Sequence, residues 1–279
     1  MLTSLVAEGN SLRSATRLSG VSINTVSKLL VDVGTACQKN HDEHVCNLKT
    51  KRVQADEIWS FVYAKAKNVP EEKRGFGVGD VWTWTAMDAD SKLMISYLVG
   101  SRDAGYAFQF MSDVASRLSN RVQLTTDGHR AYLEAVEGVF GIDIDYAQLV
   151  KIYGTEQLPS ESRYSPPKCL GARPTTITGN PDEAHISTSY IERQNLTLRM
   201  GKRRFTRLTN AFSKKIENHK HSIALHFMHY NFCRIHKTLR VTPAMEGGFL
   251  TTFGSLKNLR DWQIEPISTF TGNRDWCMS

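Results

Sequence analysis

From Val53 to Tyr153 the hydrophobic pattern predicts three strands in succession, then helix, strand, helix and strand. The predicted strands are 53–62, 81–87, 93–99, 122–126 and one within 142–153, and the predicted helices are 104–118 and 131–140. A helical region then opens at Ser187 or Ser189 and continues, with interruptions, to about Thr238. This order predicts a mixed α/β fold, in which helices cover both faces of a five-stranded mixed sheet.

Three acidic residues stand at particular places in this order. Asp56 lies in the middle of the first predicted strand, Asp127 ends the fourth, and Glu192 lies in the opening turns of the late helix. In a ribonuclease-H-like sheet, which has this order of elements, the first and fourth strands are neighbours. We therefore expect the three carboxylates to converge.

Converging carboxylates have a specific chemical use. Burying a lone carboxylate is costly, and three together repel one another unless a hard cation neutralises them. Carboxylate oxygens suit Mg²⁺, and Mn²⁺ substitutes for it. Two such ions activate the attacking oxygen and stabilise the leaving oxygen of a displacement at phosphorus. Asp56, Asp127 and Glu192 are thus the candidate metal-binding and catalytic residues. Glu57 follows Asp56 and is expected to face the other side of the strand as a structural or ion-paired residue.

The first 36 residues carry helical spacing interrupted at Gly9 and Gly20. The arrangement of a small residue, a Gly turn and an apolar position six residues later, Val26, is typical of a helix-turn-helix, with a plain three-helix bundle as the alternative. Short polar side chains suited to reading a DNA groove remain on the third helix: Ser22, Asn24, Thr25, Ser27 and Lys28.

Residues 37–50 are interpreted as a helix end and linker. Cys37, His41, His44 and Cys46 are too closely spaced for a zinc finger, which needs about a dozen residues between its ligand pairs. The predicted organisation is therefore a helix-turn-helix region and linker over 1–50, a catalytic domain over 51–250 and a tail over 251–279.

Charge and cysteine usage narrow the class of protein. The chain carries a net charge of +7, and between Arg193 and Arg240 there are twelve Lys or Arg residues and one acid, Glu217. An ordinary solvated helix face usually carries both signs of charge, so this one-sided basicity favours a segment that binds nucleic acid. The five scattered cysteines fit reduced thiols, and no apolar run reaches the roughly 18 residues of a membrane span. We expect a cytoplasmic protein with no membrane partner.

The three acidic motifs, taken together, resemble a known family. Asp56-Glu-Ile-Trp-Ser-Phe, Thr126-Asp-Gly and Tyr190-Ile-Glu-Arg-Gln-Asn are similar to the DDE transposases of bacterial insertion sequences, of the insertion sequence 1 type, with retroviral integrases as wider relatives. The resemblance covers residues 10–250. It implies binding to the element's terminal inverted repeats, metal-dependent cleavage to a 3′-OH and attack of that 3′-OH on target DNA. It also implies at least a dimer on DNA, associated with the bacterial nucleoid.

Further DNA-contacting residues are expected after Glu192. Asn195 and Arg199 lie one and two helical turns beyond it, and the family places a DNA-contacting basic residue where Arg199 stands. The basic segment after this helix is expected to follow phosphates through Lys202, Arg203, Arg204 and Arg207.

Two other functions remain open from the sequence. One is a ribonuclease-H-like nuclease acting on RNA–DNA hybrids. The other is a non-catalytic helix-turn-helix regulator or remnant.

Overall fold

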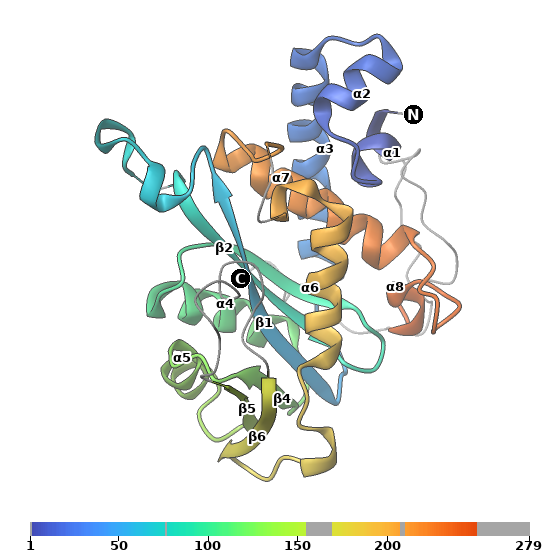
Figure 1. The fold of residues 1–279 in the computed structure, drawn as a ribbon. Coiled ribbons are helices and arrows are strands. Elements are labelled where there is room, and N and C mark those ends of the chain that lie inside the picture. Colours follow the sequence, from blue (N-terminus) through green and yellow to red (C-terminus); the bar gives the residue numbers. More distant parts are fainter. Residues whose placement is uncertain (1, 76, 155–168, 207–209, 250–279) are drawn as a thin grey trace.

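A computed structural model describes residues 2–75, 77–154, 169–206 and 210–249 (Figure 1). Its centre is a six-stranded mixed sheet in the order β3-β2-β1-β4-β5-β6. The strands are β1 (Arg52–Val62), β2 (Gly79–Asp88), β3 (Met94–Gly100), β4 (Gln123–Asp127), β5 (Asp145–Tyr153) and β6 (Cys169–Thr178). The order of the first five strands is consistent with a ribonuclease-H-like fold.

The prediction of five strands was wrong by one. The additional strand, β6, pairs antiparallel with β5 at the edge of the sheet, in a stretch for which no strand was predicted. Most of its side chains are exposed, so β6 has no buried face to produce an alternating pattern. Backbone hydrogen bonds to β5, which leave no trace in the sequence, define this strand.

The register of the central strands places two of the acids next to each other across neighbouring strands. β1 runs antiparallel to β2 and parallel to β4, with Ala55 opposite Thr126. The residues that follow this pair are Asp56 and Asp127. Two strands far apart in the sequence thus deliver one carboxylate each to the same place.

Helices cover both faces of the sheet (Figure 1). They are α4 (Ala104–Arg117), α5 (Ala131–Phe140), α6 (Ser189–Gly201), α7 (Ile216–Met228) and the short α8 (Pro243–Glu246), with a π-helical turn at His229–Cys233. One core contains Phe110 and Val136 of α4 and α5, and the other contains Leu198 and Phe227 of α6 and α7. Short 3-10 turns occur at Ala66–Asn68, Glu71–Lys73, Glu183–His185 and Arg203–Phe205.

Three helices precede the sheet: α1 (Leu2–Ala7), α2 (Leu12–Ser19) and α3 (Ile23–His44). Gly20 ends α2 with φ +73°, a conformation that glycine adopts without strain. The hydroxyl of Ser22 caps α3 by accepting a hydrogen bond from the backbone N–H of Thr25. Ala15 and Val26 are fully buried where α2 and α3 meet.

The third helix continues through most of the segment expected to be a linker. α3 reaches His44 because Cys37 and His41 lie on its buried face, and His41 Nε2 lies 3.0 Å from the carbonyl oxygen of Ile95. Within the described residues, these Cys and His side chains form no metal-binding group. The helix then packs along α7, where Gly34 lies directly against His221.

No helix in the described part of the chain has the length and apolar character needed to cross a membrane.

Candidate active site

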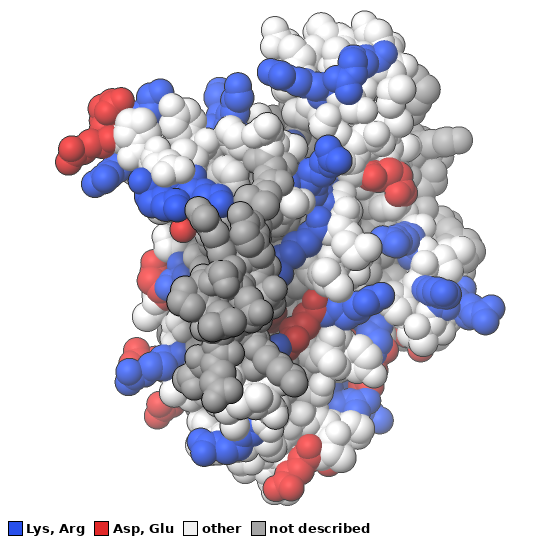
Figure 2. Space-filling view, viewed as in Figure 1, with Lys and Arg blue, Asp and Glu red and all other residues white. Residues whose placement is uncertain are grey.

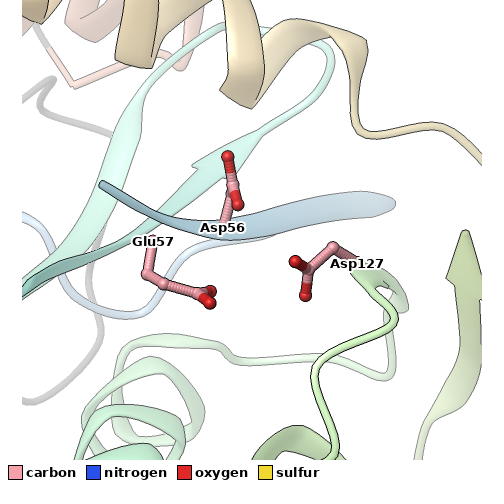
Figure 3. A group of neighbouring side chains, drawn as sticks. All are labelled: Asp56, Glu57 and Asp127. Atoms are coloured by element: carbon pink, nitrogen blue, oxygen red, sulfur yellow. The ribbon is translucent and has the colours of Figure 1, made fainter. Parts of the chain in front are cut away.

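Asp56, Asp127 and Glu57 form a compact acidic group (Figure 3). One carboxylate oxygen from each lies within 4.8 Å of the others. Asp56 comes from the middle of β1 and Asp127 from the end of β4. The predicted convergence of these two acids is confirmed, and Glu57 joins them.

Asp56 faces α6. Its Oδ2 accepts a hydrogen bond from Asn195 Nδ2 at 2.9 Å, and the Asn195 side-chain oxygen in turn accepts one from the Thr85 hydroxyl at 3.3 Å. Burial, followed by the charges of Glu57 and Asp127, raises the pKa of Asp56 from 3.8 to about 7. The carboxylate of Asp56 is thus both buried and close to the negative charges of Glu57 and Asp127.

Glu57 lies on the opposite face of β1, as the alternation of a strand requires. Its Oε1 lies 2.5 Å from Arg102 Nη2, and its Oε2 accepts a hydrogen bond from the Tyr132 hydroxyl at 3.0 Å. Arg102 also stacks over the Trp82 ring, 4.6 Å from its centroid. The ion-paired role expected for Glu57 is confirmed. The sequence did not reveal that its carboxylate would also approach Asp127.

Asp127 is oriented by the turn that follows it. Its Oδ1 accepts the backbone N–H of His129 at 3.0 Å, and the imidazole of His129 stacks on Trp84 with centroids 5.9 Å apart. His129 thus helps to fix the loop after β4.

Glu192 lies in the first turn of α6 and outside the 4.8 Å group. Its Oε1 accepts the Thr188 hydroxyl at 2.5 Å, and its Oε2 lies 2.6 Å from Lys151 Nζ. Asn195, three residues later on the same helix face, contacts Asp56 directly. Glu192 therefore lies about one helical turn along α6 from the residue that contacts Asp56, and it is held by Lys151, which no sequence motif marked.

Several of the predicted DNA-contacting residues are exposed or partly exposed. Asn24, Thr25 and Lys28 are exposed on the first turns of α3, Arg203 is exposed after α6, and Arg199 is partly exposed. Arg207 lies outside the described residues.

Three of the predicted DNA contacts are engaged within the protein. The Asn195 amide holds Asp56, the Lys202 ammonium donates to the carbonyls of Val6 and Ala7 at 2.7 and 2.8 Å, and Arg204 donates to Ser213 Oγ and the Asn218 carbonyl. Burial lowers the pKa of Lys202 to about 8 and that of Arg204 to about 10. These internal partners argue against phosphate contacts by the three residues.

The donor set suits a hard divalent cation. Carboxylate oxygens are the ligands that Mg²⁺ and Mn²⁺ prefer, and a cation bound beside Asp56 and Asp127 would offset the burial and the neighbouring charges of Glu57 and Asp127 that raise the pKa of Asp56. On the face that carries α6, acidic side chains lie close to several Lys and Arg side chains (Figure 2).

No family model and no curated protein matches this chain. Among solved structures, it is similar to the Mos1 transposase paired-end complex with left transposon end, at 14% identity and TM-score 0.23, over 52% of this chain and 56% of that one. A piggyBac transposase synaptic complex with hairpin DNA matches at 13% identity and TM-score 0.34, over 98% of this chain and 76% of that one. The Mos1 mariner paired-end complex with Mn matches at 12% identity and TM-score 0.24, over 80% of this chain and 75% of that one. The chain spans about half the length of the first of these.

Proposed function

We propose that this protein is a DNA transposase of the insertion sequence 1 type. In this proposal it cleaves a DNA strand at the end of an insertion sequence and transfers the resulting 3′-OH to target DNA. The observation that carries the proposal is the meeting of Asp56 and Asp127 at neighbouring strands, with Glu192 one helical turn from the Asn195–Asp56 contact.

Asp56, Asp127 and Glu192 would hold the metal ions, Mg²⁺ in the cell with Mn²⁺ as a substitute, two in number. Held there, such ions would supply Lewis-acid activation of the phosphodiester and of the attacking oxygen. Asn195 fixes the Asp56 carboxylate, and the backbone N–H of His129 fixes that of Asp127. The protein thereby holds its oxygen donors in place for in-line displacement.

DNA binding is assigned to two sets of residues. Asn24, Thr25 and Lys28 lie at the start of α3, which follows α2 through the Gly20 turn in the manner of a helix-turn-helix that reads the terminal repeats. Arg199 and Arg203, at and beyond the end of α6, are assigned to phosphate contacts, together with Arg207. Two copies of the chain would hold the two element ends together.

The test is a strand-transfer assay with labelled element ends, a plasmid target and Mg²⁺ or Mn²⁺. Asp56→Asn, Asp127→Asn and Glu192→Gln are each expected to reduce product by more than a hundredfold. Glu183→Gln, at an exposed acid shortly before α6, is the matched control and should retain activity. Unchanged transfer by Glu192→Gln would overturn the assignment of the third acid.

Further assays on the same protein preparations distinguish the transposase from the two alternative functions. Cleavage of an RNA–DNA hybrid without strand transfer would indicate a ribonuclease-H-like nuclease. DNA binding with neither reaction would indicate a regulator.

A further inference from the structure

Lys151 pairs with Glu192, the acid that lies outside the compact group, although it belongs to none of the acidic motifs. Asp127, the last residue of β4, pairs with Leu149 of β5, so Lys151 stands two residues beyond the end of β4. Its ammonium lies 2.6 Å from Glu192 Oε2. Burial lowers the pKa of Lys151, but the hydrogen bond and charge of Glu192, with smaller contributions from Tyr153 and Asp56, outweigh it and raise the pKa. One cation from β5 is thus paired with Glu192 on α6.

The position of this ammonium differs from that of the other cation near the acids. Arg102 pairs with Glu57 on the opposite face of β1, where Tyr132 also holds the carboxylate. Lys151 instead contacts the acid that stands apart from the compact group. For Glu192 to bind a metal ion together with Asp56 and Asp127, its carboxylate must leave Lys151 or share it.

We propose that Lys151 is a positioning residue for the proposed phosphoryl transfer. Without a metal ion, its ammonium neutralises Glu192. With a metal ion bound, Glu192 would be one of the residues that hold it, and the freed ammonium of Lys151 would contact a non-bridging oxygen of the DNA phosphate. This inference rests on the proposed function.

A lysine side chain is suited to both contacts, the one with Glu192 and the one with the DNA phosphate. Its ammonium is a compact charge with three donors on a flexible four-carbon stem, so it can change partners by rotating side-chain bonds. The side chains of Lys151 and Glu192 are 32% and 36% exposed, which leaves room for that rotation and for an approaching phosphate. The backbone of β5, paired on both sides, keeps the base of the side chain fixed.

A competing cation has a measurable consequence. Because Lys151 and the metal ion are attracted to the same carboxylates, removing the ammonium should strengthen metal binding. Removing it should also weaken the reaction, because the phosphate loses a contact. A purely structural lysine would not produce these opposite effects, since loss of structure weakens both.

The experiment compares Lys151→Met, Lys151→Arg and Lys51→Met with the unaltered chain. Lys51 precedes β1 and is exposed, and five residues of strand place it about 17 Å from Asp56, so its loss removes the same charge outside the site. Mn²⁺ affinity is measured without DNA by the electron paramagnetic resonance signal of free Mn²⁺. Strand cleavage is then measured at saturating Mn²⁺.

Lys151→Met is expected to bind Mn²⁺ about tenfold more tightly, because a competing charge within a few ångströms is gone. It should cleave at least tenfold more slowly. Lys151→Arg, which keeps the charge, should retain the Mn²⁺ affinity and part of the cleavage, and Lys51→Met should change neither. Circular dichroism establishes that each variant is folded, with Lys151→Gln replacing any that is not.

Weaker or unchanged Mn²⁺ binding by Lys151→Met would overturn the inference, as would unchanged cleavage. The parallel Glu192→Gln titration keeps this failure distinct from failure of the proposed function. If Glu192→Gln weakens Mn²⁺ binding while Lys151→Met has no effect, only the role of Lys151 is wrong. If the unaltered chain binds no Mn²⁺, the proposed function itself fails.

Discussion

Asn195 on α6 donates a hydrogen bond to Asp56 on β1, with 2.9 Å between Nδ2 and Oδ2. Asn195 is buried, and its side-chain oxygen is held by the hydroxyl of Thr85 on β2. One amide therefore connects the helix that carries Glu192 to the strand that carries Asp56. This contact sets the distance between the first and third acids.

Asn195→Ala should reduce strand cleavage about tenfold to a hundredfold, the usual cost of removing a hydrogen bond that orients a metal ligand. Mn²⁺ affinity should fall with it, because the amide no longer orients the Asp56 carboxylate. Both are measured as for the Lys151 variants. Thr197→Ala, on the outer side of the same helix, is the control. Unchanged activity in Asn195→Ala would mean that the contact is not needed for catalysis.

The raised pKa of Asp56 predicts how the stability of the metal-free protein depends on pH. The folded-state pKa is about 7 and the ordinary value is 3.8, so between these pH values the folded chain binds more protons than the unfolded chain. The contribution of Asp56 to the free energy of unfolding therefore decreases as pH rises from about 4 to 7 and is constant above that.

Asp56→Asn removes this dependence. Urea unfolding with a chelator present should show the variant to be more stable than the unaltered chain at pH 8, by about 4 kcal/mol, since each pKa unit corresponds to about 1.4 kcal/mol. At pH 4 the two should be nearly equal. An equal difference at both pH values would contradict the raised pKa.

Gly34 marks the closest approach of α3 to α7. A β-carbon added there would lie 2.3 Å from His221 Cβ and 2.7 Å from its Cα, so α7 itself would have to move. Gly34→Ala gains about 1 kcal/mol of helix propensity. We expect the overlap to outweigh that gain and the free energy of unfolding to fall by about 2 kcal/mol.

Gly138→Ala is the matched control in α5. Its added β-carbon would meet Phe108, at 3.2 Å from Cε2 and 3.7 Å from Cδ2, on a half-exposed side chain that can move aside. The propensity gain should therefore remain and leave this variant as stable as the parent or more so. If both alanine variants were stabilised in urea unfolding, α3 and α7 could not be as close as described.

The sheet and two of the acids were predictable because their signals are local. Strands with one or two buried faces produce alternating or continuous apolar patterns, and an acid within such a pattern, such as Asp56, stands out. Edge strand β6 has no buried face and therefore no pattern. Within the predicted helix end and linker, α3 extends further than the sequence indicated, because polar residues such as Asn40 and Asp42 outnumber the few buried ones on its last turns.

The partners of charged residues were harder to predict. A charge run in the sequence does not indicate which ammonium is folded inward, so Lys202 and Arg203 could not be distinguished. Lys151 gave no signal either, because its role depends on the pairing of β5 with β4 and on the position of α6. Contacts of this kind are set by the tertiary structure.

Lys202 and Arg203 are adjacent cations with opposite environments. Lys202 is buried with its ammonium on the last carbonyls of α1, whereas Arg203 is exposed beyond α6. Lys202→Met leaves two carbonyls without their donor and should lower the free energy of unfolding by about 1–3 kcal/mol. Arg203→Met should leave stability within about 0.5 kcal/mol of the parent.

For binding to element-end DNA we expect the opposite order, in which Arg203→Met has the larger effect and Lys202→Met the smaller one. If its guanidinium contacts a phosphate, Arg203→Met weakens binding to all sequences alike and reduces the slope of log affinity against log salt by about 1. Lys202→Met, assayed at a temperature where it remains folded, should keep the parental slope because its ammonium faces α1. A reduced slope in Lys202→Met with a parental slope in Arg203→Met would mean that DNA binding exchanges the environments of these two side chains.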